Sequence, residues 1–257
     1  MLVTGTTEIV GIIGNAIMQV KSPGVMNRYF ADRGLNTVLI PMEIAPGAIA
    51  GFVATVPYKQ VVAPLLDRLT PHAERFSTVN VFRRDANGTL EGEMFDGVGF
   101  IAVAARHGIN PAGKQAAVVG AGGVACAIAN SLCENGVARL SIQDLDRAKQ
   151  DNLIATLRGA FPGIEIAAGI AGVEDLDILV NATPVGMNGD PHLPLPDAVL
   201  AGLTARCFVA DVVTEPTMTP FLTLARQRGC IIQTGVEMTE TQMLSLAGFL
   251  GVAALGP

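Results

Sequence analysis

One glycine-rich segment near the middle of the 257-residue chain constrains the fold more than any other feature. The apolar run Gln115–Val119 leads directly into Gly120–Ala125 (GAGGVA), and a helical stretch follows. This is the G-x-G-x-x-A turn of a Rossmann unit, in which the glycines let a pyrophosphate approach the backbone and the helix N-terminus attracts its charge. The cofactor-binding residues predicted here are Gly120, Ala121, Gly122 and Gly123.

Short β-rich runs alternate with helical stretches along the chain, which predicts an α/β fold. The runs from residue 115 onward are nearly all apolar, as in a parallel sheet covered on both faces. The expected strands are 8–13, 36–44, 50–56, 78–83, 115–119, 139–143, 164–167, 178–181, 207–213 and 230–233. The expected helices are 23–33, 61–69, 97–107, 124–135, 147–161, 220–227 and 239–250.

This order of elements indicates two α/β domains. We expect residues 1–100 to form the first, residues 101–235 to form the Rossmann domain, and the tail 236–257 to join the first domain. The connection Ala45–Ile49 is too short for a parallel crossover, which needs a dozen or more residues. The two runs beside it are therefore not parallel neighbours, or one of them is not a strand.

Composition narrows the class of protein. Seventeen basic and 23 acidic residues give a net charge of −6 without a basic block, which argues against nucleic-acid or anionic-membrane binding. Half the residues are apolar, which excludes a disordered chain. The apolar run Gln115–Cys133 approaches the ~20 residues of a membrane span, but its small residues fit the glycine turn better.

Cysteine and histidine spacing gives further expectations. The four cysteines form no CxxC pair and are interpreted as reduced, buried side chains of a cytoplasmic protein. Met1–Gly14 has Glu8 and no basic residue ahead of its apolar run, so no signal peptide is expected. The three histidines lack the spacing of a metal site, and we expect no metal.

The second strand of the Rossmann unit ends at Asp144, close to where an acid that binds the cofactor ribose belongs. A carboxylate there accepts hydrogen bonds from the ribose 2′-hydroxyl and repels a 2′-phosphate, which favours NAD. The alternative role of Asp144 is to cap the helix that begins at Arg147. Because Arg147 and Lys149 can neutralise a 2′-phosphate, NADP stays open.

Two polar residues of the first domain are candidates for catalysis. Lys59 follows an apolar strand, and Asp96 stands at the head of a helix. A lysine near a carboxylate can carry the proton that accompanies hydride transfer. Taken singly, Lys59 also fits a surface lysine and Asp96 a helix cap.

The order of motifs resembles the shikimate dehydrogenase family over nearly the whole chain. Its His-Ser-x-Ser-Pro entrance motif is similar to Gln19–Pro23, and its Asn-Val-Thr-x-Pro-x-Lys motif to Val53–Lys59. Further matches are Ser77–Val81 to Gly-Ala-Val-Asn-Thr, Met94–Gly97 to Asn-Thr-Asp-Gly, Asn181–Met187 to Asn-Ala-Thr-Pro-x-Gly-Met, and Gly235–Met238 with Gln242.

The resemblance implies a two-domain oxidoreductase that acts on a ring hydroxyl of a shikimate- or quinate-like acid, in the cleft between a substrate domain and a Rossmann domain. The implied catalytic pair is Lys59 and Asp96. The implied substrate-binding residues are Ser22 for the carboxylate and Thr55, Asn80 and Gln242 for ring hydroxyls. The residues implied to line the nicotinamide pocket are Thr183, Pro184, Val185, Val212, Gly235 and Met238. A monomer or homodimer is expected.

The chain departs from the family pattern at several positions. Val20, Val53 and Thr214 replace a serine, an asparagine and a tyrosine, which points to a changed or less polar substrate at the carboxylate end. Gln143–Leu145 replaces the Asn-Arg-Thr of NADP-using members, in agreement with the charge argument for NAD. Relatives also place a helix where this chain has only Ala45–Ile49.

Three hypotheses follow. The first is an NAD-dependent dehydrogenase of a shikimate- or quinate-like hydroxy acid. The second is an NADP-dependent shikimate dehydrogenase of aromatic amino-acid biosynthesis. The third, from another class, is a catalytically silent nucleotide-binding paralogue or sensor, which the altered entrance motif favours and the retained Lys59 and Asp96 oppose.

Overall fold

The computed structural model describes residues 6–14, 17, 19–44, 51–55 and 58–252. The chain divides into two compact units, Met1–Ala50 and Gly51–Pro257, which are described separately below. The division at residue 50 concerns packing alone, and the predicted boundary between substrate and Rossmann domains near residue 100 stays a prediction.

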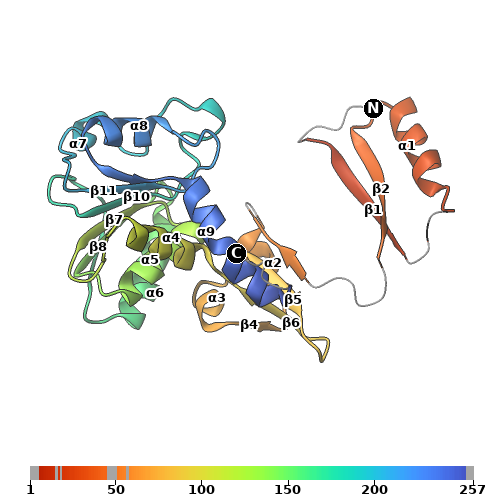
Figure 1. Cartoon of the computed structure of the whole chain (residues 1–257), viewed down its shortest axis with the longest axis horizontal. Helices are drawn as coiled ribbons and strands as arrows, with labels where there is room; N and C mark the ends of the chain where they lie inside the picture. Colours follow the sequence, from red (N-terminus) through yellow and green to blue (C-terminus); the bar gives the residue numbers. More distant parts are fainter. Residues whose placement is uncertain (1–5, 15–16, 18, 45–50, 56–57, 253–257) are drawn as a thin grey trace. The chain divides into compact units, whose positions relative to one another are not determined.

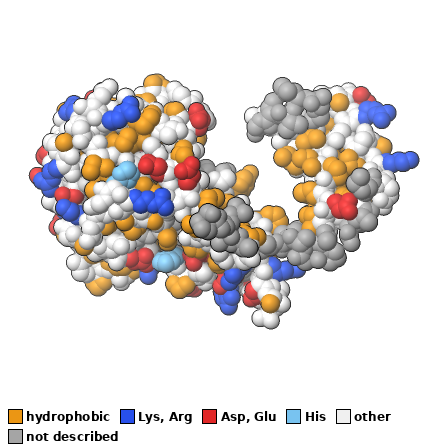
Figure 2. All heavy atoms as spheres, in the orientation of Figure 1, with side chains coloured by type: hydrophobic (Ala, Val, Ile, Leu, Met, Phe, Trp, Pro, Cys, Tyr) orange, Lys and Arg blue, Asp and Glu red, His pale blue; other side chains and the backbone are white. Residues whose placement is uncertain are grey.

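The first unit is a β-α-β segment. Strand β1 (Glu8–Gly14) pairs in parallel with β2 (Thr37–Glu43), and helix α1 (Ser22–Asp32) connects them. The Asn27 side chain pins α1 to β2, because it donates to the Leu39 carbonyl at 3.0 Å and accepts from the Leu39 N–H at 2.6 Å. Ile9 and Ile13 on β1 stay 65% and 61% exposed, and Figure 2 shows hydrophobic side chains gathered at the surface of this unit.

The second unit begins with a four-stranded sheet in the order β3-β5-β6-β4. Its strands are β3 (Gly51–Val53), β5 (Val81–Arg84), β6 (Leu90–Glu93) and β4 (Arg68–Leu69). The first three are antiparallel and β4 runs parallel to β6. Because β2 pairs with β1 and β3 with β5, the runs on either side of Ala45–Ile49 are not parallel neighbours. The connection itself lies outside the described residues.

The helix expected over 61–69 is wrong. The chain forms helix α2 (Lys59–Val62) and a 3₁₀ turn (Ala63–Leu65), then extends at Leu66 into β4. Pro64 lies in that turn, and a proline has no N–H with which to continue an α-helical ladder. Helix α3 (Pro71–Phe76) and strand β6 were not predicted, since the sequence of β6, Leu-Glu-Gly-Glu, contains a single apolar residue.

A six-stranded parallel sheet forms the Rossmann part (Figure 1). Its strands are β7 (Gln115–Val119), β8 (Arg139–Gln143), β9 (Glu165–Ala168), β10 (Ile178–Asn181), β11 (Phe208–Asp211) and β12 (Ile231–Gln233). The order β12-β11-β10-β7-β8-β9 is that of a doubly wound dinucleotide-binding sheet, which switches direction between β7 and β10. The carboxyl ends of these two strands are therefore where a cofactor is expected.

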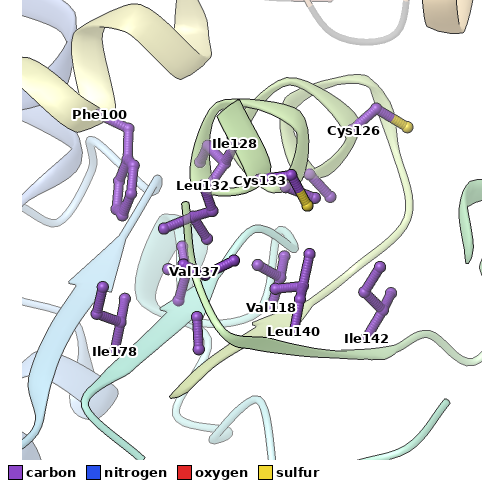
Figure 3. Close-up of a cluster of buried hydrophobic side chains, with 14 of the residues drawn as sticks. Phe100, Val118, Cys126, Ile128, Leu132, Cys133, Val137, Leu140, Ile142 and Ile178 are labelled. Carbon is purple, nitrogen blue, oxygen red and sulfur yellow. The ribbon is translucent and has the colours of Figure 1, made fainter. Parts of the chain in front are cut away.

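Alternating residues of these strands build two cores, one on each face of the sheet. Val118, Leu140 and Ile142 pack under helices α4 (Asp96–Arg106), α5 (Gly123–Glu134) and α6 (Arg147–Ala160), as Figure 3 shows for α5. Ala117, Leu179 and Val209 face α7 (Asp197–Leu200) and α8 (Pro220–Gln227). Two covered faces explain the apolar excess of this half of the chain.

The last helix, α9 (Gly235–Leu250), begins one turn earlier than predicted. A capping box starts it: Thr234 Oγ1 accepts from the Glu237 N–H at 3.2 Å, and the Glu237 carboxylate accepts from the Thr234 N–H at 2.8 Å. The helix packs against α4 and β5. No helix within the described part of the chain is long and apolar enough to cross a bilayer.

Candidate active site

The glycine turn has the geometry that a pyrophosphate requires. Gly120 adopts φ +115°, and a Cβ there would lie 2.9 Å from the Ala182 carbonyl oxygen, so only glycine fits. Gly122 precedes α5 without a side-chain cap, and the space where its Cβ would lie is open. The first N–H groups of α5 are therefore not capped by a side chain, and these residues fit the phosphates of a dinucleotide.

Asp144 lies against this turn. Its Oδ2 accepts from the Ala121 N–H at 2.6 Å and its Oδ1 from the Asp146 N–H at 2.7 Å. The alternative role of Asp144 as a helix cap is wrong, because Asp146 caps α6 by accepting from the Ala148 and Lys149 N–H groups. Asp144 is thus available beside the turn that is predicted to hold the cofactor.

A cavity of about 320 Å³ adjoins the same turn. Its lining includes Ala121 of the turn, Lys149 and Asn152 of α6, and Arg75 and Ser77 at the end of α3. Arg75 hydrogen-bonds Asn130 and also lies 3.3 Å from Glu134, while Lys149 lies 3.5 Å from Asp146. The cavity therefore offers two cations beside the turn, each shared with an acid.

The two catalytic candidates form an ion pair. Lys59 Nζ donates a hydrogen bond to Asp96 Oδ2, and the two side chains are only 12% and 3% exposed. Lys59 is the first residue of α2 and Asp96 the first of α4, where the helix N-terminus favours a negative charge. The N-termini of two helices that are far apart in the sequence thus bring an amine and a carboxylate together, with both side chains largely shielded from solvent.

Asn80 extends this pair into a network. Its Nδ2 donates to Asp96 Oδ1 and to Gln242 Oε1, both at 3.0 Å, and its Oδ1 accepts from the Phe95 N–H at 3.0 Å. Asn80 and Gln242 are 3% and 6% exposed. Four of the predicted site residues, Lys59, Asp96, Asn80 and Gln242, are therefore linked side chain to side chain.

The residues predicted to line the nicotinamide pocket follow the ends of strands. Thr183, Pro184 and Val185 come after β10, Val212 comes after β11, and Gly235 and Met238 belong to the first turn of α9. Gly235 touches the β11 segment closely, since a Cβ there would lie 2.5 Å from the Val212 carbonyl oxygen. The pocket residues after β11 and at the start of α9 are therefore adjacent.

A buried polar network that the sequence interpretation missed holds these loops. Asn181 Oδ1 accepts from Thr183 Oγ1 at 2.6 Å, and Asn181 Nδ2 donates to Asp211 Oδ1 at 3.1 Å. Asp211 Oδ2 in turn accepts from Thr219 Oγ1 at 2.7 Å. Burial raises the pKa of Asp211 to about 6, although hydrogen bonds from Val213, Thr219 and Asn181 oppose that rise. The signal available in the sequence was a polar residue ending an otherwise apolar strand.

The remaining predicted residues are more exposed. Ser22 is the first residue of α1 in the first unit. Thr55 is exposed, and its carbonyl accepts from the Tyr58 N–H at 2.7 Å. Of the departures from the family pattern, Val53 on β3 is 62% exposed and Thr214 is also exposed. Among the residues that the structure describes, no three His, Cys, Asp or Glu side chains are grouped as metal ligands would be.

Comparisons with known proteins agree with this architecture. Residues 12–82 match the family model of the shikimate dehydrogenase substrate binding domain. A shikimate dehydrogenase (NADP(+)) of Geobacter metallireducens is 33% identical to this chain, covering 94% of it and 90% of the relative.

Two solved structures have the same fold over almost the full length. Shikimate 5-dehydrogenase from Listeria monocytogenes, in complex with shikimate and NAD, gives a TM-score of 0.72 at 27% identity, covering 97% of this chain and 93% of that one. Quinate dehydrogenase from Corynebacterium glutamicum, in complex with NAD, gives 0.69 at 28% identity, covering 95% and 93%. This chain belongs to the shikimate dehydrogenase family and is an oxidoreductase that acts on a CH–OH group.

Proposed function

We propose that this protein transfers a hydride between a nicotinamide dinucleotide and a ring hydroxyl of shikimate or a closely similar cyclic hydroxy acid. The observation that carries the proposal is the secluded Lys59–Asp96 pair and its connection through Asn80 to Gln242. A catalytically silent binding protein would not require an amine and a carboxylate paired at 12% and 3% exposure.

In this proposal, Lys59 handles the hydroxyl proton. Oxidation of an alcohol releases a hydride and a proton, and the bound cofactor supplies the hydride acceptor. Lys59 Nζ, as the neutral amine, takes the proton from the reacting hydroxyl, while Asp96 orients the amine and balances the positive charge that it then carries. Asn80 fixes the other oxygen of Asp96, so the carboxylate has one orientation relative to Lys59.

The other predicted residues would hold the substrate. Thr55 and Gln242 would offer a hydroxyl and an amide to the ring hydroxyls, and Ser22 would offer a hydroxyl to the carboxylate. Asn80 has both its amide N–H groups and its oxygen engaged in the network, so we assign it chiefly to positioning Asp96 and Gln242. We also propose a cytoplasmic location, which the four unpaired cysteines support.

For the cofactor, the relatives of higher identity are named as NADP(+) enzymes and support NADP(H) better than the NAD favoured by the sequence. The curated relative described above is an NADP(+) enzyme, and Arg75 and Lys149 line the cavity beside the turn. NAD(H) is the second candidate, and one observation favours it: the Asp144 carboxylate lies against the turn, where it would repel a 2′-phosphate.

Steady-state kinetics of the purified protein test both points. Shikimate and quinate are each oxidised with NAD⁺ and with NADP⁺, and formation of the reduced nicotinamide is followed by absorbance. A higher kcat/KM with NADP⁺ supports the first candidate. Replacing the acid, Asp144→Ser, is expected to shift the kcat/KM ratio toward NADP⁺, because it removes the charge that opposes the 2′-phosphate.

A substitution at the catalytic pair tests the mechanism. Lys59→Met keeps the length of the side chain but removes the amine, so turnover should fall by at least the 10²–10⁴-fold typical of an acid–base group. Calorimetric binding of the cofactor should be retained. Turnover within a few-fold of wild type would remove Lys59 from the mechanism, and absence of any dehydrogenase activity in wild type would overturn the proposed function.

A further inference from the structure

Thr78 carries a buried hydroxyl that has no hydrogen-bond partner. The residue lies between α3 and β5 and is 1% exposed. Its backbone N–H donates to the Ala73 carbonyl at 3.0 Å, whereas Oγ1 is without a partner in the described structure. Such atoms are rare because an unpaired buried hydroxyl costs more than the apolar group that could replace it.

The hydroxyl lies against the glycine turn. A Cβ built on Gly123 would lie 2.8 Å from Thr78 Oγ1 and 3.6 Å from Lys59 Cβ. Gly123 is the first residue of α5, whose earliest internal hydrogen bond runs from the Cys126 N–H to the Gly122 carbonyl. The unpaired hydroxyl therefore adjoins the helix terminus whose leading N–H groups are not capped by a side chain.

Open space is available on the same turn. A Cβ on Gly122 would meet no atom within 4 Å, in contrast to Gly123. An anion seated beside Gly122 on the N–H groups of α5 would be one residue away from Gly123, the residue that Thr78 Oγ1 adjoins, and a hydroxyl is a suitable donor to its oxygens. A ligand with such an oxygen would give Thr78 Oγ1 the hydrogen-bond partner that it lacks in the described structure.

We propose that Thr78 donates a hydrogen bond to the pyrophosphate of the bound dinucleotide. The proposal rests on the proposed function, because it takes the nicotinamide dinucleotide as the ligand of the turn. Thr78 would then bind the cofactor from the segment before β5, next to the stem of Lys59. Cofactor binding would in this way hold the catalytic lysine segment against α5.

The proposal predicts effects of opposite sign in one variant. Thr78→Val keeps the shape of the side chain and removes the hydroxyl. The melting temperature of the unliganded protein should stay level or rise, because an unpaired buried hydroxyl is lost. The Kd of the cofactor should rise about ten-fold, the effect of one hydrogen bond to a charged acceptor. ADP-ribose, which has the pyrophosphate without nicotinamide, should weaken equally.

Two further variants complete the test by calorimetry. Thr78→Ser retains the hydroxyl and should bind the cofactor within two-fold of wild type. Thr70→Val is the matched control, since Thr70 Oγ1 is also buried without a partner but lies at the start of α3. Its Kd should be unchanged.

The outcomes separate the two proposals. If wild type binds neither NAD(H) nor NADP(H), the proposed function fails. If wild type binds a cofactor and Thr78→Val binds it within two-fold, the role of Thr78 is refuted while the function stands. A clear fall in the melting temperature of unliganded Thr78→Val would also refute it, because the hydroxyl would then have a partner in the protein itself.

Discussion

Asn80 is the residue whose removal should test the site network most directly. Its side chain makes three hydrogen bonds at 3.0 Å, to Asp96, to Gln242 and from the Phe95 N–H, at 3% exposure. Asn80→Leu replaces the amide by an apolar side chain with the same branching at Cγ. All three partners then lose a hydrogen bond in a place that water scarcely reaches.

The expected loss of stability follows from these bonds. A neutral hydrogen bond contributes about 0.5–1.5 kcal/mol and one to a charged group about 1.5–3 kcal/mol. Two neutral bonds and the bond to the Asp96 carboxylate together predict a loss of about 2.5–6 kcal/mol. At roughly 2–4 °C per kcal/mol for a domain of this size, the melting temperature should fall by about 10 °C.

Thermal unfolding followed by circular dichroism measures this change. The matched control is Asn135→Ala, which removes one bond on the surface, from Asn135 Nδ2 to the Ser131 carbonyl at 2.8 Å, and should cost less than about 1 kcal/mol. Shikimate turnover of Asn80→Leu should also fall, because Asp96 loses its fixed orientation. A stability loss no larger than that of the control would refute the network as described.

Three other predictions concern stability and reactivity. Burial raises the pKa of Asp211 to about 6 from 3.8, so the free energy of unfolding is highest below about pH 4, where Asp211 is protonated, and falls as the pH rises through 6. In urea unfolding, wild type should lose stability relative to Asp211→Asn across that range. A difference between the two proteins that does not change with pH would contradict this. Burial raises the pKa of Cys126, Cys133 and Cys207 to about 12, so an aromatic disulfide reagent should modify these thiols only after unfolding; rapid reaction in the native protein would be the contrary result. Gly235→Ala should destabilise the protein by about 1–3 kcal/mol and weaken cofactor binding, because the new Cβ would lie 2.4 Å from the Val213 carbonyl oxygen. The control is Gly159→Ala on α6, where a Cβ meets no atom within 4 Å, and it should stabilise the protein by up to about 1 kcal/mol.

The Rossmann half of the fold was predictable because its signals are local. The strands 115–119, 139–143 and 178–181 and the helix 220–227 agree with the structure to the residue. The first and third strands are mostly apolar runs, the second alternates apolar and polar residues, and a proline begins the helix. The four-stranded sheet was harder. The strands β4 and β6 contain few apolar residues and exist through pairing with each other and with β5, which no local pattern encodes.

The candidate site likewise contains residues that the sequence predicts and residues that it does not. Lys59 and Asp96 were candidates from their positions in the sequence, and the resemblance between motifs added Asn80 and Gln242. The structure brings all four together. Asp211 and Thr78 were not predicted, because their interest lies in burial and in which atoms they meet. Neither property can be read from a single sequence, in which both residues look like ordinary polar positions beside an apolar run.

Helix α9 connects two parts of the proposed active site at a fixed spacing. Its first turn supplies Gly235 and Met238 of the predicted nicotinamide pocket, and one turn later Gln242 accepts a hydrogen bond from Asn80. Its far end is fastened to β5, since Arg83 donates to the Phe249 carbonyl at 2.6 Å. The spacing between the predicted nicotinamide pocket and the Asn80 network is thus tied to the ~5.4 Å pitch of one continuous helix. A motion that displaced one of them would have to carry the other with it.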